Sequence, residues 1–267
     1  MELSVLSFFI YVVICLCLGS AMTAYVARTP KYEEYIWRKE AHHFLDMSFN
    51  ESPPQAFHIG RSHCPECHET LQFYDLIPVL SFIISKGKCR YCKHTISLKY
   101  PLIELGSLAI CLPLLLISQH WLALLLVTGI FCLLICISLI DWQHQWIPDQ
   151  LNLLLLGLSL GVNLLESERM LYHAVLGMMF GYALIVSIRQ IYLTLRGIEA
   201  IGLGDAKLLA ALGAWQGLES LFYIVFYASI LGIIYALISQ KGRYQSVAFG
   251  PFLCLAAFSN FFVIHFY

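Results

Sequence analysis

The sequence contains few charged residues. Asp, Glu, Lys and Arg make up only 12% of the 267 residues, while 59% are hydrophobic. A soluble globular protein carries roughly 25% charged residues, so most of this chain is expected to lie in lipid. The net charge of −1 also indicates that the partner is not a polyanion such as a nucleic acid.

The N-terminal apolar run, residues 1–27, lacks the features of a cleaved signal peptide. It has no basic residue before its apolar part. It is also longer than the roughly 7–15 apolar residues of a signal peptide core. We therefore expect residues 1–27 to form a first transmembrane helix.

Long apolar runs dominate the rest of the chain. A transmembrane helix needs about 20 mostly apolar residues, and eight candidate segments are visible, at residues 3–27, 101–118, 121–140, 150–165, 171–195, 206–217, 219–239 and 247–266. The sixth segment is short, so it either spans half of the bilayer or lies buried between its neighbours. We predict an all-α polytopic membrane protein with about eight transmembrane segments, in which residues 101–267 form a helical membrane domain.

Residues 28–100 are the only polar stretch long enough for a soluble subdomain, and they set the predicted orientation. They hold ten Lys and Arg residues. If they lie in the cytoplasm and the eight segments alternate, fifteen of the sixteen basic residues fall on the cytoplasmic side, in agreement with the positive-inside rule. The sequence therefore predicts a bacterial inner-membrane protein, surrounded by lipid, with a cytoplasmic domain at 28–100.

Two aspartates lie at the ends of apolar segments, where ionisable residues are costly and are candidates for function. Asp141 directly follows the third segment, and Asp205 directly precedes the sixth. In the predicted topology both lie at the same cytoplasmic depth. Two carboxylates held close together do not both ionise easily, so one can act as an acid while the other activates water against a peptide carbonyl. Alternatively, both are helix-end residues at the interface, with Asp205 as an N-cap.

Residues near the two aspartates are candidates for contacting substrate or supporting the site. Glycines before Asp205 allow close approach of the backbone. Asp149 follows Pro148 and is typical of a helix start. Glu199 lies in the turn before Asp205, where it could tune the site or contact a basic substrate. With the lysine of the same motif, the supporting candidates are Gly202, Gly204, Asp149, Glu199 and Lys207.

Four of the ten cysteines form two CxxC pairs, Cys64 with Cys67 and Cys89 with Cys92. Their separation is close to the usual spacing of zinc-binding pairs. Each CxxC turn directs two thiolates at one point, and two turns complete a closed tetrahedral site that leaves no position for water. This pattern predicts structural zinc. Disulfides are the alternative, but a reducing cytoplasm opposes them. The other six cysteines lie in apolar segments and are expected to pack there.

Together, these motifs resemble the type IV prepilin peptidases, a GxGD-type family of membrane aspartyl proteases also called leader peptidase/N-methyltransferases. The resemblance covers nearly the whole chain. The chain departs from the family at Thr23, where Asn is frequent, and at Ala200, where Gly usually follows the Glu. The matching stretches are Gly19–Pro30, the tetracysteine loop Cys64–Glu104, the first aspartate motif Ser138–Asn152, the GxGD motif Glu199–Trp215, and Phe249–Leu253.

The resemblance implies that Asp141 and Asp205 are the catalytic aspartates. It also implies the substrate, a prepilin of pilus assembly or a pseudopilin of type II secretion. Such a substrate has a short basic leader before an apolar helix and is cut at the cytoplasmic face of the membrane. The family commonly methylates the new N-terminus from S-adenosylmethionine, although this sequence has no glycine-rich nucleotide loop.

Two other functions fit part of the pattern. In a proton-coupled transporter the two aspartates would form a proton relay, but transporters usually place such groups near the midplane and often contain internal repeats, which are not visible here. A non-catalytic zinc scaffold for pilus assembly would need no aspartate pair at one depth. We therefore expect a peptidase.

Overall fold

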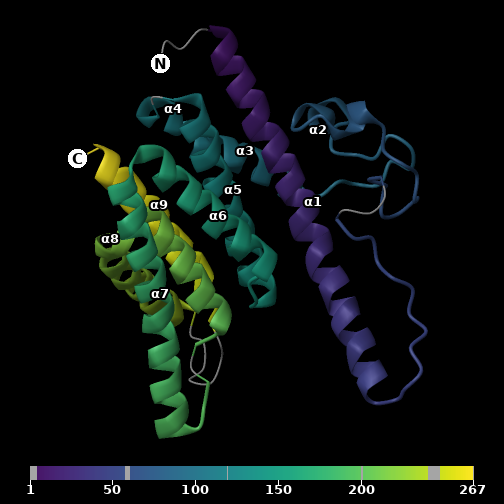
Figure 1. Ribbon diagram of the computed structural model, residues 1–267. Coiled ribbons are helices and arrows are strands. Elements are labelled where there is room, and N and C mark those ends of the chain that lie inside the picture. Colours follow the sequence, from purple (N-terminus) through teal and green to yellow (C-terminus); the bar gives the residue numbers. More distant parts are fainter. Residues whose placement is uncertain (1–4, 58–60, 119, 200, 240–246, 267) are drawn as a thin grey trace. The chain divides into compact units, whose positions relative to one another are not determined.

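The computed structural model describes residues 5–57, 61–118, 120–199, 201–239 and 247–266, and the chain divides into two compact units. The N-terminal unit comprises Glu2–Pro113 and the C-terminal unit Leu114–Tyr267 (Figure 1). The described residues contain helices and no β-strand, which confirms the predicted all-α class. Ala200 and the predicted cytoplasmic loop 240–246 lie outside the described residues.

Two helices, α1 and α3, pack together in the N-terminal unit. The hydroxyl of Tyr11 in α1 donates a hydrogen bond to the carbonyl of Cys111 at 2.9 Å. Gly19 lets the two helices approach closely, because a Cβ atom there would overlap the hydroxyl of Ser107. The elements of this unit are α1 (Val5–Phe44), the 3-10 helix η1 (Phe73–Leu76), α2 (Leu80–Ile84) and α3 (Lys99–Cys111).

Helix α1 is longer than the apolar run that predicts it. The run ends near residue 27, whereas the helix continues to Phe44. Hydropathy detects only the part of a helix that suits lipid, but the following residues are rich in Lys, Arg and Glu, which are good helix formers. Glu34 and Arg38 also form an ion pair at 2.8 Å, one helical turn apart. The division of the chain into domains at residues 27 and 100 stays a prediction, and helix α1 itself extends beyond residue 27.

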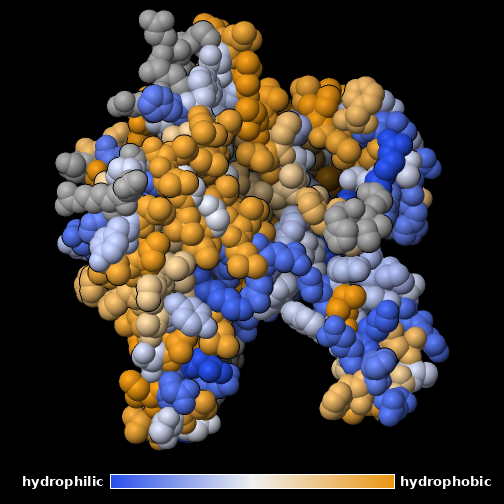
Figure 2. All heavy atoms as spheres, in the orientation of Figure 1, coloured by the Kyte–Doolittle hydropathy of each residue, from blue (hydrophilic) through white to orange (hydrophobic). Residues whose placement is uncertain are grey.

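The C-terminal unit is a helical bundle in which α8 contacts α6, α7 and α9, and α5 contacts α6 and α9. Hydrophobic residues cover much of the surface visible in Figure 2, as expected for helices that face lipid. The elements of this unit are α4 (Leu114–Ile117), α5 (Trp121–His144), α6 (Asp149–Glu166), α7 (Glu168–Arg196), α8 (Leu203–Ile238) and α9 (Gly250–Phe266).

Within the described residues, five helical stretches are long and apolar enough to cross a membrane, and α6 and α9 are shorter apolar helices. The predicted membrane protein is therefore confirmed, while the count of eight spans stays a prediction. The five long stretches are Val5–Phe44, Lys99–Ile117, Trp121–His144, Met170–Arg196 and Leu203–Ile238.

The predicted sixth and seventh segments are joined in α8 by a reversal at Gly217. This residue has φ 79° and ψ 174°, a backbone conformation that glycine adopts readily. A straight helix would place Asp205 and Tyr235 about 45 Å apart. Both instead lie at the C-terminal end of α5, where Asp141 interacts with Asp205 and the Trp142 ring lies 5.0 Å from that of Tyr235. Helix α8 therefore consists of two arms, residues 203–216 and 218–238, that run in opposite directions.

Asn163 of α6 satisfies backbone groups at this reversal. Its Nδ2 donates to the carbonyls of Ala214 and Trp215 at 3.0 and 3.1 Å. These carbonyls lie in the last turn of the first arm, where the helix supplies no partner, and an unsatisfied carbonyl is costly in lipid. The first arm also packs closely on α7, because Gly177 lies against Gly213 with no room for a side chain on either residue.

Candidate active site and candidate metal centre

Asp141 lies in the last turn of α5 and is only 4% exposed. Its Oδ2 accepts a hydrogen bond from the N–H of Gly250, the first residue of α9, at 2.9 Å. The first N–H groups of a helix have no partner within the helix and favour a negative charge. The start of α9 therefore holds one oxygen of the Asp141 carboxylate in place.

Asp205 lies in the first turn of α8 and is half-buried. The N-cap of α8 is Gly202, so Asp205 does not have the N-cap role that was its alternative interpretation. Asp141 and Asp205 lie close enough to interact electrostatically with each other. Both also interact electrostatically with the thiol of Cys254 in α9. The ends of α5, α8 and α9 thus bring the two predicted aspartates together. Two carboxylates in one partly buried space can share a proton, so that one accepts a proton while the other donates one.

The two glycines of the GxGD motif differ in how closely they are packed. A Cβ atom on Gly202 would lie 3.6 Å from Oδ2 of Asp205, an ordinary contact, whereas one on Gly204 would lie 3.3 Å from the Cβ of Ile147, which is tight. Ile147, in the linker between α5 and α6, is 8% exposed. It packs against the start of α8 and the start of α9, which sequence reasoning did not anticipate.

The other predicted supporting residues form two ion pairs. Asp149 is the first residue of α6, as its position after Pro148 predicted, and Nζ of Lys207 contacts its two carboxylate oxygens at 2.6 and 2.7 Å. This pair joins the start of α6 to the start of α8. Glu199 instead accepts from the guanidinium of Arg189 in α7, at 2.6 Å. The carboxylates of Asp149 and Glu199 are therefore each neutralised by a cation in this structure.

Gly250 is a site residue that sequence reasoning missed. A Cβ atom at this position would lie 2.7 Å from Oδ2 of Asp141, closer than such atoms approach. The sequence feature that could have revealed it is a glycine directly before Pro251 at the start of an apolar segment. At such a position the backbone N–H can contact a carboxylate. The motif Phe249–Leu253 was read only as part of the last span.

The four cysteines of the CxxC pairs form a cluster in the N-terminal unit. The sulfur atoms of Cys64, Cys67, Cys89 and Cys92 all lie within 4.8 Å of one another, and those of Cys64 and Cys92 are 3.8 Å apart. Four thiolates around zinc, with Zn–S bonds of about 2.3 Å, also lie about 3.8 Å apart. All ten cysteines are free thiols, so the alternative of disulfides is not realised. The donor set and its geometry fit one tetrahedral metal ion.

The two CxxC turns have the same structure. The N–H of Cys64 donates to the carbonyl of Glu69 at 3.0 Å, and that of Cys89 to the carbonyl of His94 at 2.8 Å. Each turn is closed by a single β-bridge, and the residue after each second cysteine has a positive φ. The two turns therefore form a short structural repeat. It was not visible in the sequence, because only the cysteines and one threonine recur at matching positions.

The thiols of the second turn influence each other's ionisation. A hydrogen bond from the N–H of Cys92 lowers the pKa of the Cys89 thiol to about 7. The N–H of His94 lowers the pKa of Cys92, but desolvation and the neighbouring thiols outweigh it and raise that pKa to about 12. One thiolate therefore forms easily, while further negative charge in the cluster needs a cation. A bound metal ion supplies that charge and deprotonates its thiol ligands.

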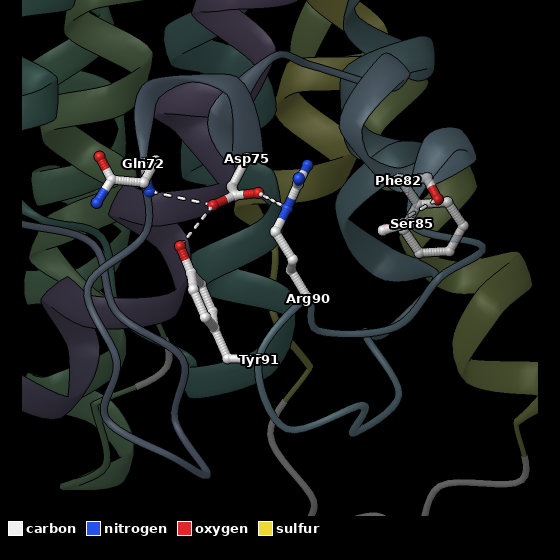
Figure 3. A network of polar contacts seen from close by, with 6 residues as sticks. All are labelled: Gln72, Asp75, Phe82, Ser85, Arg90 and Tyr91. Atoms are coloured by element: carbon white, nitrogen blue, oxygen red, sulfur yellow. Dashed lines mark hydrogen bonds and ion pairs between the residues drawn. The ribbon is translucent and has the colours of Figure 1, made fainter.

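Asp75 in η1 supports the second CxxC turn (Figure 3). Its carboxylate accepts from Nε of Arg90 at 2.9 Å, from the hydroxyl of Tyr91 at 3.4 Å and from the N–H of Gln72 at 3.1 Å. Arg90 and Tyr91 are the two residues between the cysteines of that turn. The Asp75 side chain is only 11% exposed. Sequence reasoning missed this residue because no motif links it to the cysteines.

The chain is similar over most of its length to proteins of one family. The profile of the bacterial peptidase A24 N-terminal domain matches residues 13–119, and that of the type IV leader peptidase family matches residues 128–237. A prepilin leader peptidase/N-methyltransferase of Burkholderia pseudomallei (strain 1026b) is 37% identical over 94% of this chain and 84% of that protein. One of Neisseria gonorrhoeae is 33% identical, over 97% of this chain and 93% of that protein. One of Aeromonas hydrophila is 36% identical, over 90% and 85%.

No solved structure matches the chain significantly. The two family profiles together cover most of the sequence, and the relatives match nearly from end to end. The chain belongs to the type IV leader peptidase family.

Proposed function

We propose that this chain is a membrane-embedded aspartyl endopeptidase that removes short basic leader peptides from type IV prepilins or pseudopilins. The observation that carries the proposal is the meeting of Asp141 and Asp205 at the ends of two apolar helices. Membership of the type IV leader peptidase family supplies the reaction class, and the names of the relatives supply the substrate class.

The two aspartates perform general acid–base catalysis in this proposal. One carboxylate takes a proton from water, and the oxygen of that water attacks the carbonyl carbon of the scissile bond. The other carboxyl group donates its proton toward the carbonyl oxygen, and the leaving amine is protonated as the C–N bond breaks. The N–H of Gly250 fixes one oxygen of Asp141 during these steps. Such positioned acid and base groups each contribute about 10²–10⁴ in rate.

We also propose that the new N-terminal amine is methylated, as the names of the relatives indicate. S-adenosylmethionine supplies a methyl group on a sulfonium, which an amine can accept with loss of a proton. The described residues contain no glycine-rich loop leading from a strand into a helix, the usual nucleotide cradle. We therefore assign none of them to this cofactor.

The metal of the four-cysteine cluster is zinc in this proposal, and its role is structural. Four thiolates saturate the tetrahedral coordination of zinc and leave no position for water, so the ion does not take part in the cleavage. It instead holds Cys64, Cys67, Cys89 and Cys92 together in a loop region that has little other core.

The cluster and the aspartates face the cytoplasm of a bacterial inner membrane in the proposed topology. Reporter fusions test this orientation. Fusions after Glu166 should be periplasmic, and fusions after Arg196 and after Lys241 should be cytoplasmic. A cytoplasmic signal after Glu166 would contradict the topology and remove the argument that both aspartates lie at one membrane face.

The direct test of the function is cleavage of a prepilin by the purified full chain in detergent. Mass spectrometry should find the mature protein starting after the leader, and N-methylated when S-adenosylmethionine is added. A proton-coupled transporter or a zinc scaffold would leave the prepilin intact, so the absence of cleavage would reject the proposed function in favour of one of these.

A further inference from the structure

An apolar stretch, residues 71–85, lies inside the loop that carries the four cysteines. It contains η1 and α2, and its one charged residue is Asp75. The Asp75 side chain is only 11% exposed and is paired with Arg90, so the stretch presents no free charge. Exposed apolar residues gathered in this way mark a contact with another apolar phase or molecule. Six large apolar side chains of the stretch are 40–78% exposed, those of Phe73, Leu76, Ile77, Leu80, Ile83 and Ile84.

Helices α1 and α3 run antiparallel, and their contacts show how deep each residue lies in the membrane. A Cβ atom on Gly19 of α1 would lie 3.0 Å from the Cα of Glu104, whereas the earlier residue Tyr11 bonds to the later residue Cys111. Arg28 is the first charged residue of α1 and marks the end of its apolar part. Gly19 precedes Arg28 by nine residues, which is about 13 Å along a helix. Gly19 and Glu104 therefore lie at the depth of the hydrocarbon, not at the membrane surface.

Glu104 fixes α2 at this depth. Its Oε2 accepts a hydrogen bond at 2.8 Å from the N–H of Val79, the N-cap residue of α2, and Glu104 is only 7% exposed. Val79 has φ 59°, which is uncommon for a β-branched residue, so the chain turns sharply where it meets Glu104. Helix α2 therefore begins beside the apolar part of α1, as Figure 1 shows, and hydrophobic residues cover α2 in Figure 2.

We propose that residues 73–84 form a re-entrant segment, which dips into the bilayer from the side of Arg28 and returns to the same side. Its exposed apolar side chains contact lipid acyl chains. An apolar run of about 10–14 residues is too short to cross a bilayer and is typical of such segments. The proposal does not depend on prepilin cleavage, because it uses only the contacts of α1, α2 and α3.

The backbone of the segment is suited to this place. Polar backbone groups at membrane depth need partners, because the hydrocarbon supplies none. Pro78 has no N–H, and the N–H of Val79 is bonded to Glu104. The N–H groups of Leu80, Ser81 and Ile83 donate to the carbonyls of Pro78, Ile77 and Val79. The bend and α2 can therefore lie in lipid without leaving these donors unpaired.

The residues on either side of the segment favour lipid over a protein partner. Leu102 and Leu105 flank Glu104 on α3 and are 65% and 47% exposed, so α3 already presents apolar side chains to lipid at this depth. After the segment the chain becomes basic and is exposed, which suits a return to anionic lipid headgroups. The basic residues there are Lys86, Lys88, Arg90 and Lys93.

The four-cysteine cluster lies at the base of the proposed segment. Cys67 precedes the segment and Cys89 follows it, and their sulfur atoms belong to one cluster. Closing the cluster therefore joins the two ends of a hairpin whose tip lies in lipid. Arg28 donates to the hydroxyl of Ser62 at 2.9 Å, which keeps the first CxxC turn near the charged end of the apolar part of α1.

Photo-cross-linking to lipid tests the contact. The full chain, in nanodiscs of phosphatidylcholine and phosphatidylglycerol, carries a photo-reactive amino acid at Ile84, Leu102 or Glu66. These side chains have similar exposure, at 65%, 65% and 55%. Mass spectrometry should find adducts on lipid acyl chains from positions 84 and 102 and none from 66. Adducts from 102 but not from 84, or adducts from 84 on headgroups only, would overturn the proposal. Cross-linking from 84 to a second copy or to added prepilin, in place of lipid, would overturn it as well.

Ile84→Asp tests the depth, with Ile84→Ala as the matched control. Leu80 lies one helical turn before Ile84 and carries the photo-reactive group in both variants. Insertion of Asp into a bilayer is far more costly than that of Ile or Ala, so acyl-chain adducts from position 80 should fall about fivefold or more in Ile84→Asp. They should persist in Ile84→Ala. Hydrogen exchange in α1 and α3 should be the same in both variants. Equal adducts from position 80 in the two variants would contradict the re-entrant segment.

Discussion

The C-terminal unit is built around one buried helix: 61% of the most apolar window of α5 is buried inside protein, against 22% for α7 and 17% for α8, and in the N-terminal unit the value for α1 is 22%. The loop between α1 and α3 has even less core, because Ala56, Cys64 and Cys89 are its only buried apolar residues within the described part. The C-terminal unit is therefore stabilised by helix packing. The loop of the N-terminal unit depends on hydrogen-bonded turns and on the four thiols, since so small a core does not fold alone.

This difference indicates separate tasks for the two units. A catalytic pair must be held to within about half an ångström, which needs rigid supporting helices. The closely packed α5, α8 and α9 supply that support for Asp141 and Asp205. A loop fixed at one metal ion keeps its fold with few buried residues, so its remaining surface is free to contact other molecules.

Removal of the metal should produce the largest effect and should be confined to the N-terminal unit. Structural zinc contributes about 10–16 kcal/mol to the folding of small domains. Purified chain should hold about one zinc, and Cys64→Ser with Cys89→Ser should abolish it. Hydrogen exchange should then rise throughout residues 61–98 and stay unchanged in α5.

The matched control for this experiment is Cys17→Ser, because Cys17 is an exposed thiol on α1 outside the cluster. It should keep the zinc and the exchange pattern of the wild type. Full zinc content in the double variant would disprove the four-thiolate site, and increased exchange in α5 would show that the two units are not stabilised independently.

Gly250→Ala should affect only the C-terminal unit and should act on catalysis. The added Cβ atom would lie 2.7 Å from Oδ2 of Asp141, so the carboxylate must move. A displacement of about 1 Å in a catalytic group can cost about 10²-fold in rate. A cleavage time course measures this loss, with Gly157→Ala as the control, since no atom lies within 4 Å of a Cβ there. Equal activity of the two variants would mean that Gly250 does not position Asp141.

The ion pair between Asp149 and Lys207 should have the smallest effect. Its side chains are 63% and 41% exposed, and exposed pairs contribute at most about 1 kcal/mol. A double-mutant cycle with Asp149→Asn and Lys207→Gln should give a coupling free energy of unfolding below that value. Cleavage by Asp149→Asn should fall less than tenfold. A larger loss of cleavage without loss of stability would place Asp149 among the catalytic groups.

Hydropathy and spacing predicted the elements that depend on local sequence. The apolar runs gave the helices of the C-terminal unit, and the CxxC spacing gave the four-thiol cluster. The end of α1 could not be obtained this way, because residues 28–44 are polar yet favour a helix. The reversal at Gly217 was visible only as a short sixth segment beside a seventh, and its conformation depends on Asn163, which is distant in sequence.

The site was predictable where it depends on topology and hidden where it depends on packing. Alternating spans placed Asp141 and Asp205 at one depth, and the structure brings them together. Gly250, Ile147 and Asp75 were missed because each acts through contacts with residues far away in the sequence. Glu199 was a candidate because it precedes Asp205, but its ion pair with Arg189 is a contact that the sequence did not reveal.

The most direct test of the account compares prepilin cleavage by Asp141→Asn, Asp205→Asn and Glu199→Gln. Asparagine keeps the shape of aspartate but cannot take up or release the proton. Each aspartate variant should lose at least about 10²–10⁴ in cleavage rate, with unchanged expression and zinc content, while Glu199→Gln should lose much less. Near-normal cleavage by either Asp141→Asn or Asp205→Asn would contradict the claim that the two carboxylates form one catalytic pair.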